Sequence, residues 1–227
     1  MLPEVAILIP TYNRRQVVMK NIESLNQNLR YDGKVKILIG EDSDDPELKF
    51  NPIHVVSNFP IGCAYHDPRK GLGANLNWLL QNCGTDYVIQ MDDDHILLKE
   101  LDITPHVRKL MEDETAGVVR LMHVAGHRYR ANLEGSYWRI DWESPEVYIA
   151  SNRPHLKHVS RFHGVYGYYP EGLKLGLTEE SFCHTCIDLH RQRAERGMTS
   201  PDVLIPLDVQ TESGWDHIGH SWQMEGF

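Results

Sequence analysis

The segment from Tyr87 to Leu98 constrains the fold of this chain more than any other. An apolar run of strand character, Tyr87–Met91, ends abruptly in three aspartates and a histidine, residues 92–95. Open α/β sheets bind ligands outside the carboxyl ends of their strands, and carboxylates gathered there suit a hard cation. Acidic turns are also common. An Asp-x-Asp sequence by itself therefore favours a solvated turn, and the rest of the chain has to decide between the two interpretations.

Length and charge narrow the class of protein. A chain of 227 residues predicts one domain over residues 1–227. The net charge of −9 disfavours a general binder of nucleic acid or of anionic membranes, because such proteins carry a basic face. The amino terminus shows no basic leader, and no apolar stretch is long enough to span a bilayer. We therefore expect a cytoplasmic protein.

Cysteine spacing offers a second metal hypothesis. Cys183 and Cys186 have the C-x2-C spacing of a zinc ligand pair, but the sequence holds no second pair of this kind. His217 and His220 would have to complete the site. Reduced thiols on a helix are the favoured interpretation.

The first half of the chain alternates strand and helix patterns. The patterns predict strands at Val5–Ile9, Val35–Gly40, Ile53–Val56 and Tyr87–Met91, and helices over Val17–Leu29 and from Gly71 to Cys83. Strand–helix–strand units of this kind predict an α/β fold with a largely parallel sheet.

The second half of the sequence shows a different pattern of predicted elements. Helices are predicted at Thr104–Asp113 and Thr178–Arg196, and strands at Ala116–His123 and Val203–Val209. Between Gly126 and Tyr169, aromatic and histidine residues are interleaved with charge, which indicates antiparallel strands and loops.

Three acidic clusters need one explanation. Glu41 and Asp42 end one strand, Asp92 and Asp94 follow another, and Glu179–Glu180 begin a helix. Carboxylates suit Mg²⁺ or Mn²⁺, which keep open positions for phosphate oxygens. A further carboxylate can deprotonate an incoming hydroxyl. Together the clusters indicate group transfer from a nucleotide-activated donor.

Four segments resemble family 2 glycosyltransferases, which have the GT-A fold. They are Val5–Arg14, Leu38–Ser43, Gly71–Leu80 and Val88–Asp94. The resemblance covers residues 4–98. It implies a Rossmann-like, mostly parallel central sheet flanked by helices, with a nucleotide-binding half at residues 1–98 and a mixed or antiparallel acceptor half at residues 99–227.

The resemblance also assigns donor-site residues. It implies Pro10, Thr11, Tyr12 and Arg14 under the nucleoside, Asp42 or alternatively Glu41 at the base, Asp92 at the ribose, and Asn75 on the helix after the glycines. Asp93 takes the variable middle position of the motif, and an overlapping Asp-x-His motif of Asp93 and His95 stays open. Lys70 and Arg69 are candidates for touching the diphosphate, with a surface pair as the alternative.

The implied metal ion is Mn²⁺ or Mg²⁺. Asp94 is its expected ligand, with Asp92 close by, and His220 or His217 from the tail is the expected third protein ligand. An imidazole ligand is compatible with Mn²⁺. A solvated tail is the alternative.

The family places its base in an acidic pair before a helix. Glu180 is the first candidate for that base, and Glu179 and Asp188 are the alternatives. A second alignment, through Asp188, Arg191 and Gly197, would put Cys186 where the base should be.

The resulting expectation is a metal-dependent, inverting transferase. It would move a sugar from a nucleoside-diphosphate sugar, most simply a UDP-sugar, to a hydroxyl of a glycan or another compound, with a nucleic acid acceptor not excluded. A sugar nucleotidyltransferase is disfavoured because Pro10–Asn13 replaces a glycine-rich basic loop. A non-catalytic binding module with the same fold stays open.

Overall fold

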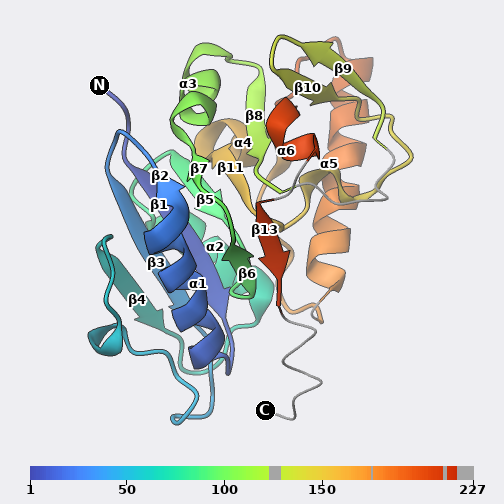
Figure 1. Cartoon of the computed structure of the whole chain (residues 1–227). Coiled ribbons are helices and arrows are strands. Elements are labelled where there is room, and N and C mark those ends of the chain that lie inside the picture. The colour runs from blue at the N-terminus through green and yellow to red at the C-terminus, as the bar shows by residue number, and fades with distance from the viewer. Residues whose placement is uncertain (123–128, 175, 212–213, 219–227) are drawn as a thin grey trace.

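A single mixed sheet organises the protein (Figure 1). The computed structural model describes residues 1–122, 129–174, 176–211 and 214–218. Its nine-stranded sheet has the order β4-β3-β1-β5-β11-β8-β12-β10-β9. The strands are β1 (Val5–Thr11), β3 (Val35–Glu41), β4 (Ile61–Tyr65), β5 (Tyr87–Gln90), β8 (Ala116–Arg120), β9 (Ala131–Glu134), β10 (Tyr137–Ile140), β11 (His155–His158) and β12 (Asp202–Pro206).

The four strands of the first half are parallel neighbours, as predicted. Strand β1 is buried on both faces, so its alternate side chains enter different cores. Val5, Ile7 and Ile9 join the apolar side of helix α1 (Arg15–Asn28). Ala6 and Leu8 join helix α2 (Leu72–Asn82) in the other core. Helices on both faces thus explain the unbroken apolar run at the start of the chain.

The second half joins the same sheet through β11. This strand is antiparallel to β5 on one side and to β8 on the other. The β9–β10 hairpin closes the far edge against β12. The helices of this half are α3 (Thr104–Glu112), α4 (Val159–Tyr166), α5 (Leu177–Glu195) and α6 (Leu207–Thr211), with short 3₁₀ turns η1 (Pro52–His54) and η2 (Tyr148–Ala150).

Two small strand pairs lie outside the main sheet. Strand β2 (Leu29–Arg30) pairs with β7 (Leu101–Asp102), and β6 (His95–Leu97) pairs with β13 (Trp215–His217). Among the described residues, no helix has the length and apolar character needed to cross a membrane.

One predicted strand was wrong in its position, and another was wrong at its carboxyl end. The segment Ile53–Val56 begins as a 3₁₀ turn, where Pro52 sits at the first position and the Asn51 side chain accepts the Ile53 N–H. The strand beside β3 is instead β4. The last predicted strand ends at Pro206, because α6 begins at the next residue. Helix α4 was also missed, within the segment predicted as strands and loops.

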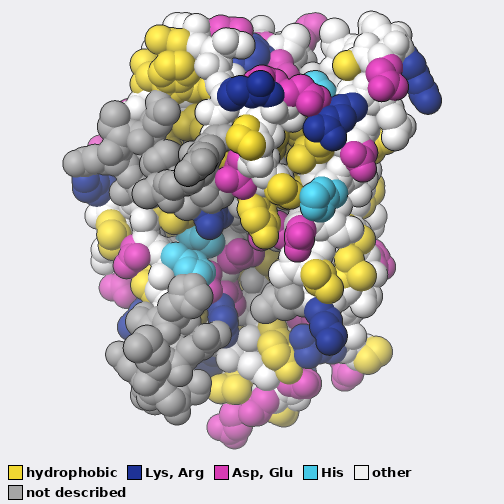
Figure 2. Space-filling model, turned by 90° about the vertical axis from the view of Figure 1, so that its right-hand side faces the viewer, with side chains coloured by type: hydrophobic (Ala, Val, Ile, Leu, Met, Phe, Trp, Pro, Cys, Tyr) yellow, Lys and Arg dark blue, Asp and Glu magenta, His cyan; other side chains and the backbone are white. Residues whose placement is uncertain are grey.

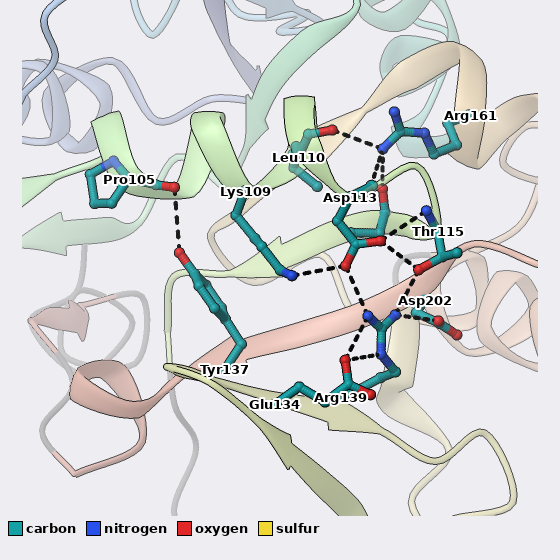
Figure 3. A network of polar contacts seen from close by, with 11 residues as sticks. Pro105, Lys109, Leu110, Asp113, Thr115, Glu134, Tyr137, Arg139, Arg161 and Asp202 are labelled. Atoms are coloured by element: carbon teal, nitrogen blue, oxygen red, sulfur yellow. Dashed lines mark hydrogen bonds and ion pairs between the residues drawn. The ribbon is translucent and has the colours of Figure 1, made fainter.

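An ion-pair cluster holds the far hairpin on the sheet (Figure 3). The Arg139 guanidinium on β10 lies 2.8 Å from an Asp113 oxygen and 2.9 Å from a Glu134 oxygen, and it also pairs with Asp202 on β12. Lys109 adds a second cation at 2.9 Å from Asp113. Although burial opposes it, hydrogen bonds from Thr115, Lys109 and Arg139 hold the pKa of Asp113 below its ordinary range.

We predict that Arg139→Met lowers the free energy of unfolding by about 2–3 kcal/mol, because it leaves half-buried carboxylates without their cation. Urea unfolding at neutral pH measures the loss. The matched control is Arg130→Met. Arg130 and Asp141 are both exposed and 3.4 Å apart, so this control should lose less than about 1 kcal/mol. Equal losses in the two variants would contradict the assigned role of the cluster.

The same cluster predicts a pH dependence. Because the folded pKa of Asp113 is depressed, its contribution is fully present above about pH 4 and is lost as the pH falls below that value. Asp202 opposes this trend, since burial raises its pKa. Arg139→Met should therefore flatten the fall of unfolding free energy as the pH is lowered below about 4, measured by urea unfolding at a series of pH values.

Candidate active site

The carboxyl ends of β1, β3 and β5 meet at one edge of the sheet. Thr11 lies opposite Glu41 in the β1–β3 register, and the Met91 N–H donates to Leu8 O next to them. The acidic clusters at residues 41–42 and 92–94 therefore come together at the place where parallel sheets bind ligands. This convergence is the frame of the candidate site.

The acidic turn after β5, residues 92–94, is held in place through the side chain of Asp93. Thr11 Oγ1 donates to one Asp93 oxygen at 2.7 Å, and Arg14 Nη1 donates to the other at 3.1 Å. Burial raises the pKa of Asp93 to about 6, against the opposing effect of Arg14. Asp93 thus faces inward and fixes the turn.

Asn21 of α1 is a supporting residue that sequence reasoning missed. Its amide nitrogen donates to His95 O at 2.7 Å and to Asp93 O at 3.2 Å, and the side chain is fully buried. The signal was present in the pattern, because Asn21 interrupts the apolar side of a helix between Val18 and Ile22. A buried asparagine at such a position needs partners, and here they are the carbonyls of the acidic turn.

Asp94, His95 and His217 form a group able to hold a metal ion. One ligand atom from each lies within 4.8 Å of the others. His217 Nε2 is 3.2 Å and His95 Nδ1 is 3.7 Å from Asp94 Oδ1. Among the described residues, Asp94 Oδ1 and His95 Nδ1 are buried without a hydrogen-bond partner. Burial lowers the pKa of His95 to about 4, so its imidazole is neutral and able to ligate. These atoms fit a divalent cation that accepts both oxygen and nitrogen.

Strand β13 brings the second histidine to this group. It pairs with β6 so that His217 lies opposite His95, and the Ile218 N–H donates to Asp94 O at 3.0 Å. Trp215 is buried and anchors the strand. Residues 215–218 of the tail thus pack against β6 and Asp94. Of the two candidate histidines, His217 is the one that the structure places beside Asp94. His220 lies outside the described residues.

Arg14 contacts the acids rather than an open nucleoside surface. Its Nη1 lies 2.6 Å from Asp94 Oδ2 and 3.1 Å from Asp93 Oδ1. The contact occupies Oδ2 of Asp94 and directs Oδ1 toward the two imidazoles. Arg14 therefore orients the carboxylate that was predicted to hold the metal.

Asp92 occupies a different environment from its two neighbours and is only partly covered. Burial, followed by the charges of Asp94 and Glu179, raises the pKa of Asp92 well above its ordinary range. It is not a member of the Asp94 group. The start of α5 is connected to β5 through Asn152, whose N–H donates to Glu179 at 2.8 Å and whose Oδ1 accepts from Gln90 at 3.0 Å.

The two acids at the carboxyl end of β3, Glu41 and Asp42, accept hydrogen bonds from the backbone of neighbouring loops. Asp42 accepts the Lys70 N–H at 2.6 Å and the Gly71 N–H at 2.7 Å. Glu41 accepts the Phe50 N–H at 2.6 Å and hydrogen bonds from Ser43. The assignment of Asp42 to the nucleobase stays a prediction. It is compatible with these contacts, because a carboxylate has further lone pairs that can accept hydrogen bonds.

Other predicted donor-site residues surround this loop. The Tyr12 hydroxyl donates to Asp44 at 3.1 Å, and the Arg69 guanidinium lies 3.8 Å from the centre of the Tyr12 ring. Arg69 is also 3.7 Å from Asp42. Pro10 is buried within β1, and the Lys70 residue is exposed. The Tyr12 ring is thus covered by a cation that also faces Asp42.

Asn75 shapes the end of β3. Its amide nitrogen donates to Gly40 O at 2.8 Å, and its oxygen lies 3.2 Å from His66 Nε2. The side chain is buried, so its amide is engaged in supporting the strand. Residue 40 is a glycine because a Cβ at this position would lie 1.8 Å from Asn75 Oδ1.

The acidic pair at the start of α5 divides into two environments. Glu179 Oε1 accepts the Asn152 N–H at 2.8 Å. Glu180 is exposed, with an oxygen 3.9 Å from His184 Nε2. Asp188 is exposed farther along the same helix. Cys186 is fully buried in mid-helix, which disfavours the alignment that places it at the base position. Cys183 and Cys186 are free thiols, and burial raises the pKa of Cys183 to about 12.

The face that carries α5 has no patch of one charge over its described part. Acidic, basic and histidine side chains are interspersed there (Figure 2). Arg191 on this helix pairs with Glu143 at 3.1 Å. The described residues of this surface form no broad basic patch of the kind that polyanion binding uses.

Comparisons with known proteins agree with this geometry. The sequence model described as Glycosyl transferase family 2 matches residues 6–194, and the chain belongs to that family. No curated protein matches the chain.

Two solved structures show the same fold. One is TarS 1–349 from S. aureus in complex with UDP-GlcNAc, at 17% identity and a TM-score of 0.61, with 90% of this chain and 56% of that chain covered. The other is the mannosyltransferase PcManGT from Pyrobaculum calidifontis in complex with GDP-Man and Mn²⁺, at 15% identity and a TM-score of 0.55, with 99% and 61% covered. The protein therefore has the GT-A fold and spans 56–61% of the length of these two chains.

We predict that Gly40→Ala disrupts the donor side of the site, because the new Cβ has to displace the Asn75 amide. The expected loss is about 1–3 kcal/mol of unfolding free energy, together with weaker nucleotide binding in a thermal-shift assay. Gly62→Ala in the neighbouring strand is the control. Its Cβ would meet the end of the Leu38 side chain at 3.1 Å and Ile37 O at an ordinary contact distance of 3.9 Å. A harmless Gly40→Ala would show that Asn75 does not shape the site.

Proposed function

We propose that this protein transfers a sugar from a nucleoside-diphosphate sugar to an acceptor hydroxyl, with a divalent metal ion and with inversion at the anomeric carbon. The observation that carries the proposal is the group of Asp94, His95 and His217 at the carboxyl end of β5. It lies beside the Pro10–Arg14 loop, in a chain of glycosyl transferase family 2. The similar structures contain UDP-GlcNAc in one case and GDP-Man with Mn²⁺ in the other.

Mn²⁺ is the better candidate for the ion. Two of the three candidate ligands are imidazoles, whereas Mg²⁺ is held chiefly by oxygen. When bound, the ion supplies a positive charge that stabilises the departing nucleoside diphosphate. Asp94 Oδ1, His95 Nδ1 and His217 Nε2 would hold it, and Arg14 keeps Asp94 in the required orientation through Oδ2.

The remaining donor contacts follow from the loop positions. The Tyr12 ring is covered by the Arg69 guanidinium, and Asp42 accepts the Lys70 N–H of the same loop. We assign Asp92 to the ribose, because it is close to the metal group without belonging to it. A UDP-sugar is the simplest donor in keeping with the resemblance of these segments.

We place the catalytic base at the start of α5. Glu180 is the first candidate because it is exposed, where an acceptor arrives from solvent. Glu179 instead uses one oxygen to accept the Asn152 N–H, so it holds the start of the helix in place. In the transfer step the base takes the acceptor hydroxyl proton, the acceptor oxygen bonds to the anomeric carbon, and the bond from that carbon to the diphosphate oxygen breaks.

The metal assignment predicts the behaviour of Asp94→Asn. We expect sugar transfer in the presence of Mn²⁺ to fall about 10²–10³-fold, the usual loss when one electrostatic stabiliser is removed. Mn²⁺ binding, measured by calorimetry, should weaken in Asp94→Asn and in His217→Asn. His158→Asn is the control, because His158 lies at the opposite end of β5, opposite Tyr87 in the β11–β5 register. Full transfer by Asp94→Asn would overturn the proposal. Nucleotide binding without transfer in the wild type would identify a binding module instead.

The base assignment predicts different results for two neighbouring isosteric variants. Glu180→Gln should lower kcat by about 10²–10⁴-fold with little change in donor affinity, because it removes a proton acceptor. Glu179→Gln keeps an oxygen that can accept the Asn152 N–H, so it should retain most activity. The reverse order of effects would move the base to Glu179.

A further inference from the structure

A chain of buried polar side chains runs behind the candidate site. Lys157 on β11 and Gln90 on β5 are both 1% exposed, and Asn152 in the loop before β11 is 3% exposed. Strand β11 lies between β5 and β8 in the middle of the sheet (Figure 1). None of these residues has a part in the proposed transfer step. Their burial requires an explanation, because buried polar groups are costly unless they are well paired.

The hydrogen bonds of this chain fix the orientation of the Gln90 amide. Lys157 Nζ donates to Gln90 Oε1 at 2.8 Å. Gln90 Nε2 donates to Asn152 Oδ1 at 3.0 Å and to the Tyr169 hydroxyl at 2.8 Å. With Lys157 Nζ as the donor, the oxygen of Gln90 faces Lys157 and its nitrogen faces Asn152. Both ends of the amide are therefore held.

Lys157 has neutral partners only. Its Nζ lies 3.2 Å from His163 Nε2, and His163 Nδ1 is 2.7 Å from Gly167 O. The carbonyl can only accept, so Nδ1 carries the proton and Nε2 accepts from Lys157. Aromatic faces of Phe162 and Tyr169 complete its surroundings at 5.5 and 5.6 Å. Within the described residues it forms no ion pair with a carboxylate, and burial lowers its pKa to about 7.

The chain leads to both flanks of the candidate site. The Asn152 N–H donates to Glu179 Oε1 at 2.8 Å, which connects the chain to the start of α5. Gln90 precedes Asp92 by two residues, on the strand that delivers the acidic turn. A buried lysine and glutamine replaced by apolar residues of similar volume would satisfy packing equally well. Their arrangement is explained if they hold these two segments in register.

We propose that Lys157, Gln90 and Asn152 form a positioning relay that fixes Glu179, and with it the start of α5, relative to the acidic turn after β5. The relay extends the proposed glycosyl transfer and rests on it. It acts through Glu179 and touches neither donor nor acceptor. Its loss misplaces the base while the donor site, which is built from β1, β3 and the Asp94 group, stays intact.

The test is the double variant Lys157→Met with Gln90→Met, which replaces a buried polar pair by two side chains of similar length. We expect kcat to fall at least 10-fold, while donor affinity by calorimetry changes less than twofold. Hydrogen exchange of residues 150–153 and 177–181 should become faster. If the residues only stabilise the fold, the melting temperature should fall, but kcat should not fall selectively while donor affinity is kept.

A second variant covers the case in which the double variant fails to fold. Asn152→Ala removes the side-chain acceptor of Gln90 and keeps the backbone N–H that Glu179 accepts. It should show the same loss of kcat to a smaller extent. Tyr137→Phe is the control, because it removes one hydrogen bond to a buried histidine, His106 at 3.0 Å, far along the sheet on β10.

The outcomes separate the relay from the proposed function. Wild-type kcat and unchanged exchange in the relay variants would overturn the relay and leave the glycosyltransferase intact. Absence of transfer by the wild type with any donor and Mn²⁺ would overturn the proposed function. In that case exchange at residues 150–153 and 177–181 alone decides whether the relay holds the two segments, and unchanged exchange refutes it.

Discussion

The candidate site depends on holding three adjacent carboxylates at one end of a buried strand. Residues 92–94 are all aspartates, and carboxylates that share a low-dielectric site oppose one another's ionisation. Arg14 and Thr11 bind Asp93, and Asn21 binds the carbonyls of the turn. These three residues come from the β1–α1 unit. The turn therefore takes its shape only when that unit has packed against β5, which couples the site to the formation of the core.

The anchoring also separates the roles of the three aspartates. Asp93 is directed into the protein, and Asp94 has one oxygen on Arg14 and the other toward His95 and His217. Asp92 belongs to neither arrangement, and burial raises its pKa well above the ordinary range. Because β11 enters the sheet beside β5, side chains from the second half of the chain contact Gln90, two residues before the turn. One strand junction thus connects the donor side with the helix that carries the acidic pair.

Sequence patterns predicted the parallel half and its acids because the necessary information is local. Apolar runs identified β1, β3 and β5, and the acids lie at the carboxyl end of β3 and two residues beyond the end of β5. The prediction of a strand at Ile53–Val56 was wrong, because Ile53 and Val56 are exposed and Pro52 begins a 3₁₀ turn. Asn21 and Gln90 were visible as polar residues within apolar patterns. Their partners were not visible, since Gln90 and Lys157 are 67 positions apart.

The sequence by itself determined the order of strands and helices in the first half, the acids at their ends and the resemblance to family 2 glycosyltransferases. These follow from side-chain chemistry and from periodicity over a few residues. Only the tertiary structure decided which carboxylate oxygen faces which partner, and that His217 is brought to Asp94 by the β6–β13 pairing. The physical reason is that desolvation and partner choice depend on contacts between distant segments. Arg14 and Asp94, for example, are 80 residues apart and form a hydrogen bond of 2.6 Å.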